Sequence, residues 1–213
     1  MTYDFTRCPD RHRTGSLKWE RYSGRDVLPM WVADLDFVSA PEIVAALQQR
    51  TAHGVFGYTI PPRSTVEAVL EYLQTCHGVT ATAEQIVWFP GLVPALNVAC
   101  RAFVQRGEEV LTCTPVYPPF LSAPQNADVG LRKVDLAEKD GVWNIDFDAL
   151  ENAVTSQTKL FILCNPHNPV GRVFPEATVA RLAEFCRRHQ LILISDEIHC
   201  DLVLDDLPHT SGL

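Results

Sequence analysis

Residues 160–201 read LFILCNPHNPVGRVFPEATVARLAEFCRRHQLILISDEIHCD, and this stretch decides the fold. Residues 160–164 are apolar and have the length of a buried strand, which the prolines of the next five residues bring to an end. From Pro175, apolar side chains recur every three or four residues and predict a helix with a basic last turn. Residues 191–194 form a second apolar run. Strand, helix and strand make one βαβ unit, and a right-handed crossover sets its two strands parallel.

Polar side chains follow both predicted strands. Asn165 and Asn168 come after the first strand, and Asp196 comes after the second. Open α/β sheets bind ligands at this edge, where the carboxyl ends of parallel strands meet. Any one of these residues could simply build a turn or cap a segment. Burying a carboxylate without a cation costs on the order of several kcal/mol, however, so we expect a positively charged group beside Asp196.

A second candidate ligand site lies at a predicted strand-to-helix joint. Residues 85–89 predict a strand, and Gly91, Leu92 and Val93 turn it into a helix. The backbone N–H groups at the start of a helix are unpaired and favour a phosphate. The signal is weak by itself, because any such joint can hold a glycine. The chain has no G-x-G-x-x-G and no P-loop lysine, so this joint does not predict a dinucleotide site.

Tyr117 lies among prolines after a strand predicted over residues 109–113. It is either a core aromatic with its hydroxyl at the surface or a ring fixed for stacking on a ligand.

The other predicted segments are an arm over residues 1–25, helices over residues 41–50 and 64–77, a loop that carries Tyr58, a strand over residues 129–134, a turn at Asp140-Gly141 and a helix capped by Asp146.

Composition bounds the class of protein. The 213 residues are 46% hydrophobic, which is enough for a substantial core, and the formal net charge is −8. Since no Lys/Arg-rich run occurs, we expect neither nucleic acid nor a membrane as a partner. The seven cysteines contain no C-x-x-C pair and are predicted to be reduced, buried thiols, and no metal site is predicted. Without a signal-peptide or membrane-spanning run, the chain is predicted to be cytoplasmic.

The motifs NPHNPVG, SDEIH, TPVYPPF and MWVADLDF together resemble those of the fold-type I pyridoxal-phosphate enzymes. They are most similar to the MalY/PatB group of cystathionine β-lyases within the class I/II aminotransferase superfamily. The resemblance implies an α/β, aspartate-aminotransferase-like large domain, with helices flanking a mostly parallel sheet that is incomplete at the C-terminus. It assigns residues 1–50 to an N-terminal arm and a small-domain segment, and residues 51–213 to the cofactor-binding large domain.

The same resemblance implies pyridoxal 5′-phosphate as the cofactor and a homodimer as the assembly. In that comparison the phosphate lies on the backbone of the helix start and on a tyrosine of the second protomer, and the ring lies among polar side chains at the strand ends. The residues carried over are Gly91, Leu92, Val93 and Tyr58 for the phosphate, Tyr117, Asn168, Asp196 and His199 for the ring, with Tyr117 also a possible proton relay, and Ala33 and Asp34 for the substrate.

The sequence departs from the resemblance at the Schiff-base lysine. The four lysines are Lys18, Lys133, Lys139 and Lys159, and none lies at a predicted strand end beside the polar cluster. We therefore expect the chain to stop before that lysine and to be inactive alone. The resemblance implies a carbon–sulfur β-lyase that releases a thiol, pyruvate and ammonia from a sulfur-containing amino acid. The alternatives are an aminotransferase and a non-catalytic binding or regulatory remnant of the fold.

Overall fold

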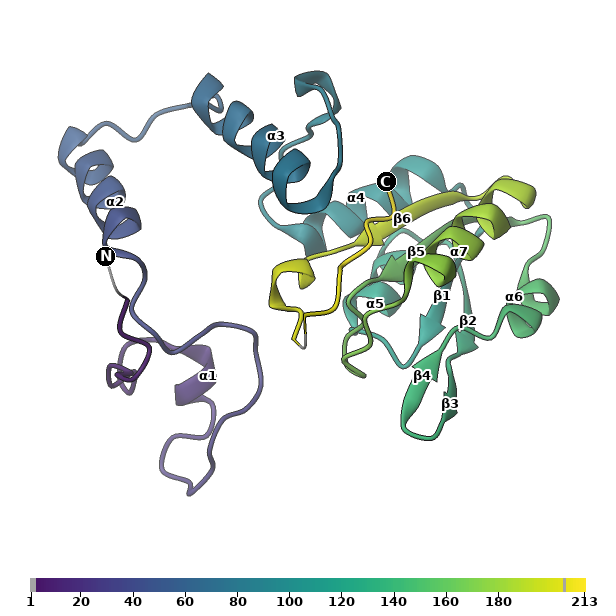
Figure 1. Ribbon diagram of the computed structural model, residues 1–213, viewed down its shortest axis with the longest axis horizontal. Helices are drawn as coiled ribbons and strands as arrows, with labels where there is room; N and C mark the ends of the chain where they lie inside the picture. The colour runs from purple at the N-terminus through teal and green to yellow at the C-terminus, as the bar shows by residue number, and fades with distance from the viewer. Residues whose placement is uncertain (1–2, 205) are drawn as a thin grey trace. The chain divides into compact units, whose positions relative to one another are not determined.

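The structure is a computed structural model that describes residues 3–204 and 206–213 (Figure 1). The chain falls into two units, Met1–Ile60 and Pro61–Leu213. The first unit contains α1 (Leu17–Glu20) and α2 (Pro41–His53). The helix predicted over residues 41–50 is thus confirmed, and it ends where Gly54 adopts a left-handed φ of 74°. The assignment of residues 1–50 and 51–213 to functional parts stays a prediction.

The second unit is built on a parallel sheet of four strands in the order β2-β1-β5-β6. Strands β3 and β4 form a separate antiparallel hairpin, which turns at the predicted Asp140-Gly141. The predicted βαβ unit is confirmed as β5, α7 and β6. In chain order the elements are α3 (Arg63–His77), η1 (Ala83–Gln85), α4 (Leu92–Phe103), β1 (Glu109–Thr114), α5 (Pro119–Asn126), β2 (Gly130–Asp135), β3 (Ala137–Lys139), β4 (Val142–Asn144), α6 (Phe147–Ala153), β5 (Thr158–Cys164), α7 (Glu176–Arg188), β6 (Ile192–Asp196) and η2 (Cys200–Leu202).

Side chains of the central strands alternate between two apolar cores. Along β5, Leu160, Ile162 and Cys164 pack in the core that contains residues of α4 and α5. Phe161 and Leu163 pack in the core that contains residues of α6 and α7. Helices therefore cover both faces of the sheet (Figure 1), and for this reason β5 has no polar face. The predicted α/β class, a parallel sheet flanked by helices, is confirmed.

The strand predicted over residues 85–89 is wrong. Gln85 ends the short helix η1, in which its N–H donates to Thr82 and its side chain accepts from the Thr82 N–H. Residues 86–89 then run without strand pairing, and the Val87 side chain is 71% exposed. An apolar run becomes a strand only where a neighbouring backbone offers hydrogen bonds, and no such neighbour is present among the residues that the structure describes.

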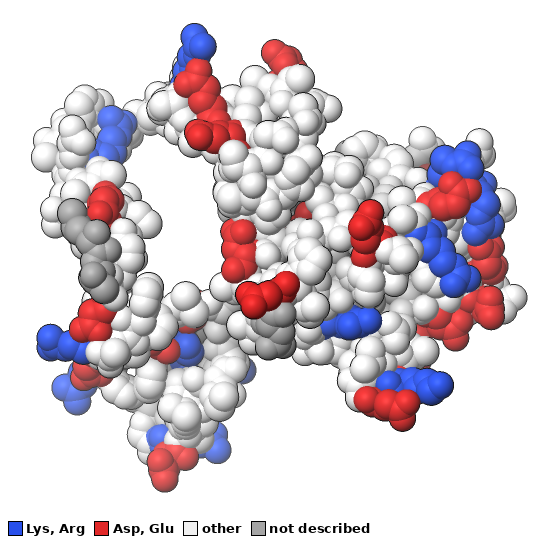
Figure 2. Space-filling view, viewed as in Figure 1, with Lys and Arg blue, Asp and Glu red and all other residues white. Residues whose placement is uncertain are grey.

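Charged residues on the outer side of α7 lie next to opposite charges. Arg187 pairs with Glu184 of the same helix at 2.7 Å, and Arg188 pairs with Glu151 of α6. Figure 2 shows basic and acidic side chains interspersed over this part of the chain. Throughout residues 3–204 and 206–213, every helix is too short or too polar to cross a membrane.

Leu182 of α7 tests the core on one face of the sheet. Its side chain is fully buried, so Leu182→Ala leaves a cavity and should lower the free energy of unfolding by about 2–5 kcal/mol. The control is Leu204→Ala, which truncates a leucine that is 78% exposed and should change stability by less than about 0.5 kcal/mol. Urea denaturation followed by circular dichroism measures both. Equal losses in the two variants would contradict the position of Leu182 in the core.

Candidate functional site

Three parallel strands end at the same level along one edge of the sheet. Cys164 of β5 lies opposite Asp196 of β6, and β1 is aligned with β5 through Thr112 opposite Ile162. The loops after β1 and β5 and the end of β6 therefore leave the sheet together. The expected gathering of polar residues at these strand ends is confirmed, whereas their binding roles remain predictions.

Asp196 is a buried carboxylate without a cationic partner. It is the last residue of β6 and is 9% exposed. Its Oδ1 accepts one hydrogen bond, from the Ile198 N–H at 3.2 Å, and no lysine, arginine or histidine in the described part of the chain forms an ion pair with it. Burial raises the pKa of Asp196 above its ordinary value, and the Ile198 N–H and the nearby His199 offset this only in part. The expected positive group is therefore not one of these side chains.

The two asparagines after β5 have different surroundings. Asn165 is fully buried, donates from its side chain to the Thr210 carbonyl at 3.1 Å and accepts from the Phe174 N–H at 3.1 Å. It builds the turn and holds the C-terminal segment. Asn168 is half-buried, and its backbone N–H donates to the Cys164 sulfur at 3.4 Å. Its side-chain amide has no partner among the described residues, which leaves it available to a ligand.

His167 joins the loops that follow β1 and β5. Its ring is 2% exposed, with Nε2 2.9 Å from the Pro115 carbonyl oxygen and Nδ1 3.1 Å from that of Cys164. Burial lowers the pKa of His167, although the two carbonyls act in the opposite direction. The ring thus fixes the loop of Tyr117 against that of Asn168. The sequence did not predict the structural role of His167, because its contact partner Pro115 lies 52 residues away. The two prolines that flank His167 were the only local signal.

The start of α4 lies close to the end of β6. Gly91 precedes the helix with a φ of 125°, a conformation in which any side chain would be strained. Leu92 and Asp196 line one cavity of 420 Å³. The first N–H groups of a helix lack intrahelical partners, and since Pro94 has no N–H, the available donors are the amides of Leu92 and Val93 together with Gly91.

Tyr117 and His199 complete the predicted residues of this edge. Tyr117 lies between β1 and α5 and is 41% exposed, which argues against a core aromatic. His199 is half-buried and lines a cavity of 500 Å³ with Asn168 and Arg172. The structure therefore brings His199 together with Asn168, and Asp196 together with Leu92.

Three predicted site residues, Tyr58, Ala33 and Asp34, belong to the first unit. Tyr58 is fully exposed and Ala33 is exposed. Asp34 forms an ion pair with Arg11 at 2.6 Å, and Arg11 also binds Asp36 at 2.7 Å. Asp34 already has a cationic partner within its own unit, and the roles predicted for these three residues toward substrate and phosphate are not tested by these contacts.

No lysine of the second unit lies at the carboxyl edge of the sheet. Lys133 is in the middle of β2, and Lys139 ends β3 in the hairpin. Lys159 enters β5 at its amino end and donates to the Ser156 carbonyl at 3.0 Å. Lys18 belongs to the first unit, where it is ion-paired. That none of the four lysines is the Schiff-base amine stays a prediction.

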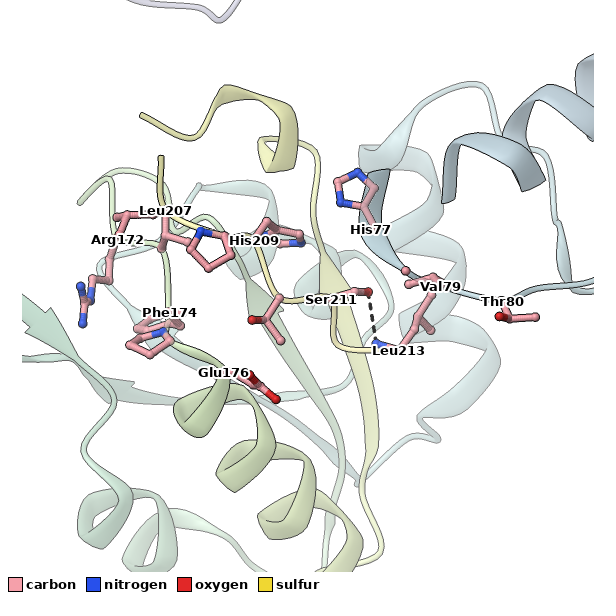
Figure 3. A pocket seen from close by; sticks show the side chains of 15 residues that line it. His77, Val79, Thr80, Arg172, Phe174, Glu176, Leu207, His209, Ser211 and Leu213 are labelled. Carbon is pink, nitrogen blue, oxygen red and sulfur yellow. Dashed lines mark hydrogen bonds between the residues drawn. The ribbon is translucent and has the colours of Figure 1, made fainter. Parts of the chain in front are cut away.

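Glu197, next to Asp196, anchors the C-terminal segment. Its Oε1 accepts from the Ser195 hydroxyl at 2.6 Å and from the Gly212 N–H at 2.7 Å, and its Oε2 lies 3.0 Å from His209 Nε2. Burial raises the pKa of Glu197, but these hydrogen bonds outweigh it, so the pKa lies below its ordinary value. His209 and His77 both line a cavity of 690 Å³. Figure 3 shows their side chains at this cavity.

All seven cysteines are free thiols, as expected, but the prediction that they are buried holds only in part. Cys8 lies in the polar N-terminal segment and Cys76 on the exposed side of α3, and both are exposed because neither faces a core. Cys200 is half-buried. The four buried thiols are Cys100, Cys113, Cys164 and Cys186.

A parallel α/β sheet whose carboxyl edge holds an uncompensated buried carboxylate, close to a helix start, is typical of the open α/β proteins that bind ligands at this edge. The chain matches the aminotransferase class I and II family over residues 25–212, and it belongs to that family. It is 41% identical over 212 residues to cystathionine beta-lyase PatB of Bacillus subtilis, a match that covers 97% of this chain and 55% of PatB.

Two solved structures are similar over the whole chain. Cystalysin from Treponema denticola, which contains a pyridoxal 5′-phosphate cofactor, has a TM-score of 0.93 and 35% identity, covering 100% of this chain and 56% of its own. The pyridoxal-phosphate-bound C–S lyase from Staphylococcus hominis has a TM-score of 0.92 and 32% identity, covering 99% and 55%. The chain thus spans about half the length of the relatives it matches.

The raised pKa of Asp196 predicts a pH-dependent penalty on stability. The folded-state pKa of Asp196 lies above the unfolded value of about 3.9, so the folded chain binds the proton more tightly than the unfolded chain. Folding stability therefore falls as the pH rises from the unfolded-state pKa to the folded-state pKa. Asp196→Asn removes the penalty and can still accept from the Ile198 N–H. Its free energy of unfolding should exceed that of the wild type at pH 7, with a smaller difference at about pH 3.

Urea denaturation at a series of pH values measures this difference. Asp148→Asn is the control, because it removes an exposed carboxylate from the first turn of α6, where negative charge is favourable, and should not raise stability. A loss of stability at pH 7 in Asp196→Asn would contradict the uncompensated burial of this carboxylate.

Proposed function

We propose that this chain binds pyridoxal 5′-phosphate at the carboxyl edge of its sheet and serves a carbon–sulfur β-lyase that splits sulfur-containing amino acids of the cystathionine type. The names of PatB and of the Staphylococcus hominis lyase, and the cofactor of cystalysin, support the proposal. The observation that carries it is the buried carboxylate of Asp196, which lacks a cation among the described residues.

Asp196 fits a protonated pyridine nitrogen. Such a nitrogen offers one N–H donor and one positive charge, and these are what the buried carboxylate lacks. When bound, pyridoxal 5′-phosphate supplies an aldehyde for the substrate's amino group and a ring that accepts the electron pair left by the α-proton. Beside that nitrogen, ionised Asp196 would hold the proton on it and so keep the ring able to accept electrons.

Other residues of the edge bind and orient the cofactor. The amides of Gly91, Leu92 and Val93 would donate to the phosphate at the positive end of α4. The exposed ring of Tyr117 would stack on the cofactor, and its hydroxyl is the candidate proton relay. Asn168, whose amide is unengaged, contacts the polar edge of the ring together with His199, which lines the same cavity.

The chain contributes binding groups rather than the catalytic amine. Transfer of the α-proton in this chemistry needs an amine beside the aldehyde. Lys133, Lys139 and Lys159 lie elsewhere on the sheet unit, and Lys18 is engaged in an ion pair. The proposal therefore assigns cofactor binding to these 213 residues and assigns no proton transfer to their lysines.

A homodimer and a cytoplasmic location are further parts of the proposal. Tyr58 is fully exposed in a loop, where it packs against nothing in its own unit, and this suits a phenol that reaches a phosphate in a second copy. Ala33 and Asp34 are assigned to the substrate side of the site. Seven free thiols suit a reducing compartment. Sedimentation velocity of the chain with Tyr58→Phe as control would test whether a dimer forms and whether the phenol affects it.

The reaction is tested in a chimera that replaces the matched segment of PatB by this chain, because the match covers 97% of the chain. The chimera should release pyruvate from cystathionine. Amino transfer to a keto acid without pyruvate would instead favour the aminotransferase. Bound cofactor without either reaction would favour a non-catalytic remnant of the fold. The same chimera with Asp196→Asn should keep its fold and lose most of its turnover, and unchanged turnover would contradict the role of Asp196.

Tyr117 is tested by two substitutions in the 213-residue chain. Tyr117→Phe keeps an aromatic ring and removes the phenol, whereas Tyr117→Ala removes both. If the ring stacks on the cofactor, only the alanine variant should raise the Kd for pyridoxal 5′-phosphate, by about 2- to 10-fold for a stacking energy of about 0.5–1.5 kcal/mol. Equilibrium dialysis measures the Kd without any need for turnover. Equal Kd values in the wild type and both variants would place Tyr117 away from the ring.

A further inference from the structure

A mixed cluster of nitrogen, sulfur and oxygen donors lies outside the proposed cofactor site. His77 is the last residue of α3, and Cys200 and Asp201 open η2, so the cluster joins positions more than 120 residues apart within the second unit. One potential ligand atom from each residue lies within 4.8 Å of the other two. The imidazole, thiol and carboxylate groups have no part in the binding edge described above.

Two of the three distances in the cluster are close to those around a tetrahedral zinc ion. His77 Nε2 is 3.7 Å from Cys200 Sγ and 3.5 Å from Asp201 Oδ1. Ligand atoms at the usual zinc bond lengths are about 3.3–3.6 Å apart on a tetrahedron. The third pair, Cys200 Sγ and an Asp201 carboxylate oxygen, lies within 4.8 Å, so side-chain movements would bring all three atoms to one zinc ion.

The donor set selects among metal ions. Magnesium and calcium prefer sites made of oxygen atoms, whereas thiolate and imidazole favour zinc. The His77 side chain is only 9% exposed and Cys200 is half-buried, although Asp201 is 64% exposed. Two ligands are thus sheltered, and the exposed carboxylate faces the side from which an ion and its water would enter.

Tyr72 orients the exposed member of the cluster. Its hydroxyl donates to Asp201 Oδ2 at 2.6 Å, which leaves Oδ1 as the oxygen nearest His77 Nε2. A hydrogen bond to the second oxygen of a ligating carboxylate is a common feature of metal sites. The same hydroxyl lies 2.8 Å from His77 Nε2 and 3.8 Å from Cys200 Sγ, so zinc would replace these two contacts and retain the one with Asp201 Oδ2.

His209 provides a second, independent observation. Its ring packs edge-on against that of His77, with centroids 5.6 Å apart, and its side chain is 4% exposed. Its Nε2 is paired with Glu197, but its buried Nδ1 has no partner among the residues that the structure describes. A buried polar atom without a partner requires an explanation, and a hydrated metal ion beside His77 would supply one.

We propose that His77, Cys200 and Asp201 bind one zinc ion, with water in the fourth position. Binding forms a zinc–sulfur bond and releases the thiol proton of Cys200 to solvent, without any change of oxidation state. The ion would fasten the end of α3, a helix without a fully buried residue, to the turn after β6, and its fourth position would stay open to water. None of its three ligands belongs to the proposed cofactor site.

Cobalt(II) is the probe, because its bond to a thiolate gives a near-ultraviolet charge-transfer band. The purified 213-residue chain is stripped with a chelator and titrated with cobalt. We expect one cobalt ion per chain, a thiolate band, and loss of the band when zinc is added. Zinc should also raise the thermal midpoint of the stripped protein, since a ligand of the folded state stabilises it.

Matched variants separate this cluster from the other thiols. Cys200→Ser should abolish the band, whereas Cys76→Ser, which alters an exposed cysteine next to His77, should retain it. His77→Ala and Asp201→Asn should each weaken zinc binding at least 10-fold, and Tyr72→Phe should keep the band. Circular dichroism of the stripped variants verifies their fold, and Asp201→Asn, which alters an exposed residue, serves if Cys200→Ser does not fold. A wild type without the band, or Cys200→Ser with it, would overturn the proposal.

Discussion

The parallel pairing of β5 with β6 is the constraint on which the rest of the site depends. Residues of β5 must alternate between two apolar cores, so a slip by one position would turn Phe161 and Leu163 to the wrong helices. This fixes Cys164 opposite Asp196, and the Asn165 N–H continues the pairing by donating to the Asp196 carbonyl at 3.0 Å. Apolar burial along the strands thus positions a carboxylate that itself contributes nothing to the core.

Asp196 and Glu197 are adjacent carboxylates whose pKa values move in opposite directions. Glu197 accepts from Ser195, Gly212 and Ser211 and lies against His209, so its charge is compensated by the chain itself. Asp196 has one backbone donor. Both carboxylates are shielded from water, yet their pKa values shift in opposite directions. The number of hydrogen-bond donors around each carboxylate therefore decides the direction of the shift. The fold supplies hydrogen bonds to Glu197 but no cation to Asp196. The uncompensated burial of Asp196 lowers the stability of the folded chain, and a positively charged ligand would restore that stability.

Local patterns in the sequence predicted the strands and the helix whose apolar side chains pack in the two cores. The apolar runs of β1, β5 and β6 and the periodicity of α7 were sufficient, and so was Asp146, whose side chain accepts from the Ala149 N–H at the start of α6. Residues 86–89 have the same apolar character as β5, yet they form no strand because pairing depends on a neighbour that a local pattern cannot reveal. The gathering of Asn168 and Asp196 at one edge followed from strand polarity, a rule of topology rather than of residue type. The approach of the start of α4 to Asp196 did not follow from that rule, because no strand precedes α4.

Contacts between distant segments were beyond the reach of the sequence. The His167 ring meets Pro115, and His77 meets Cys200, across separations for which spacing carries no information. These contacts share a consequence. The segment after α3 runs through η1 to Gly91, which offers an amide to the proposed phosphate site. Fastening His77 to the turn after β6 therefore limits how far this segment can move relative to β6, the strand that carries Asp196. Preorganisation of the amides at α4 and the carboxylate of Asp196 would then depend on a cluster that touches neither of them.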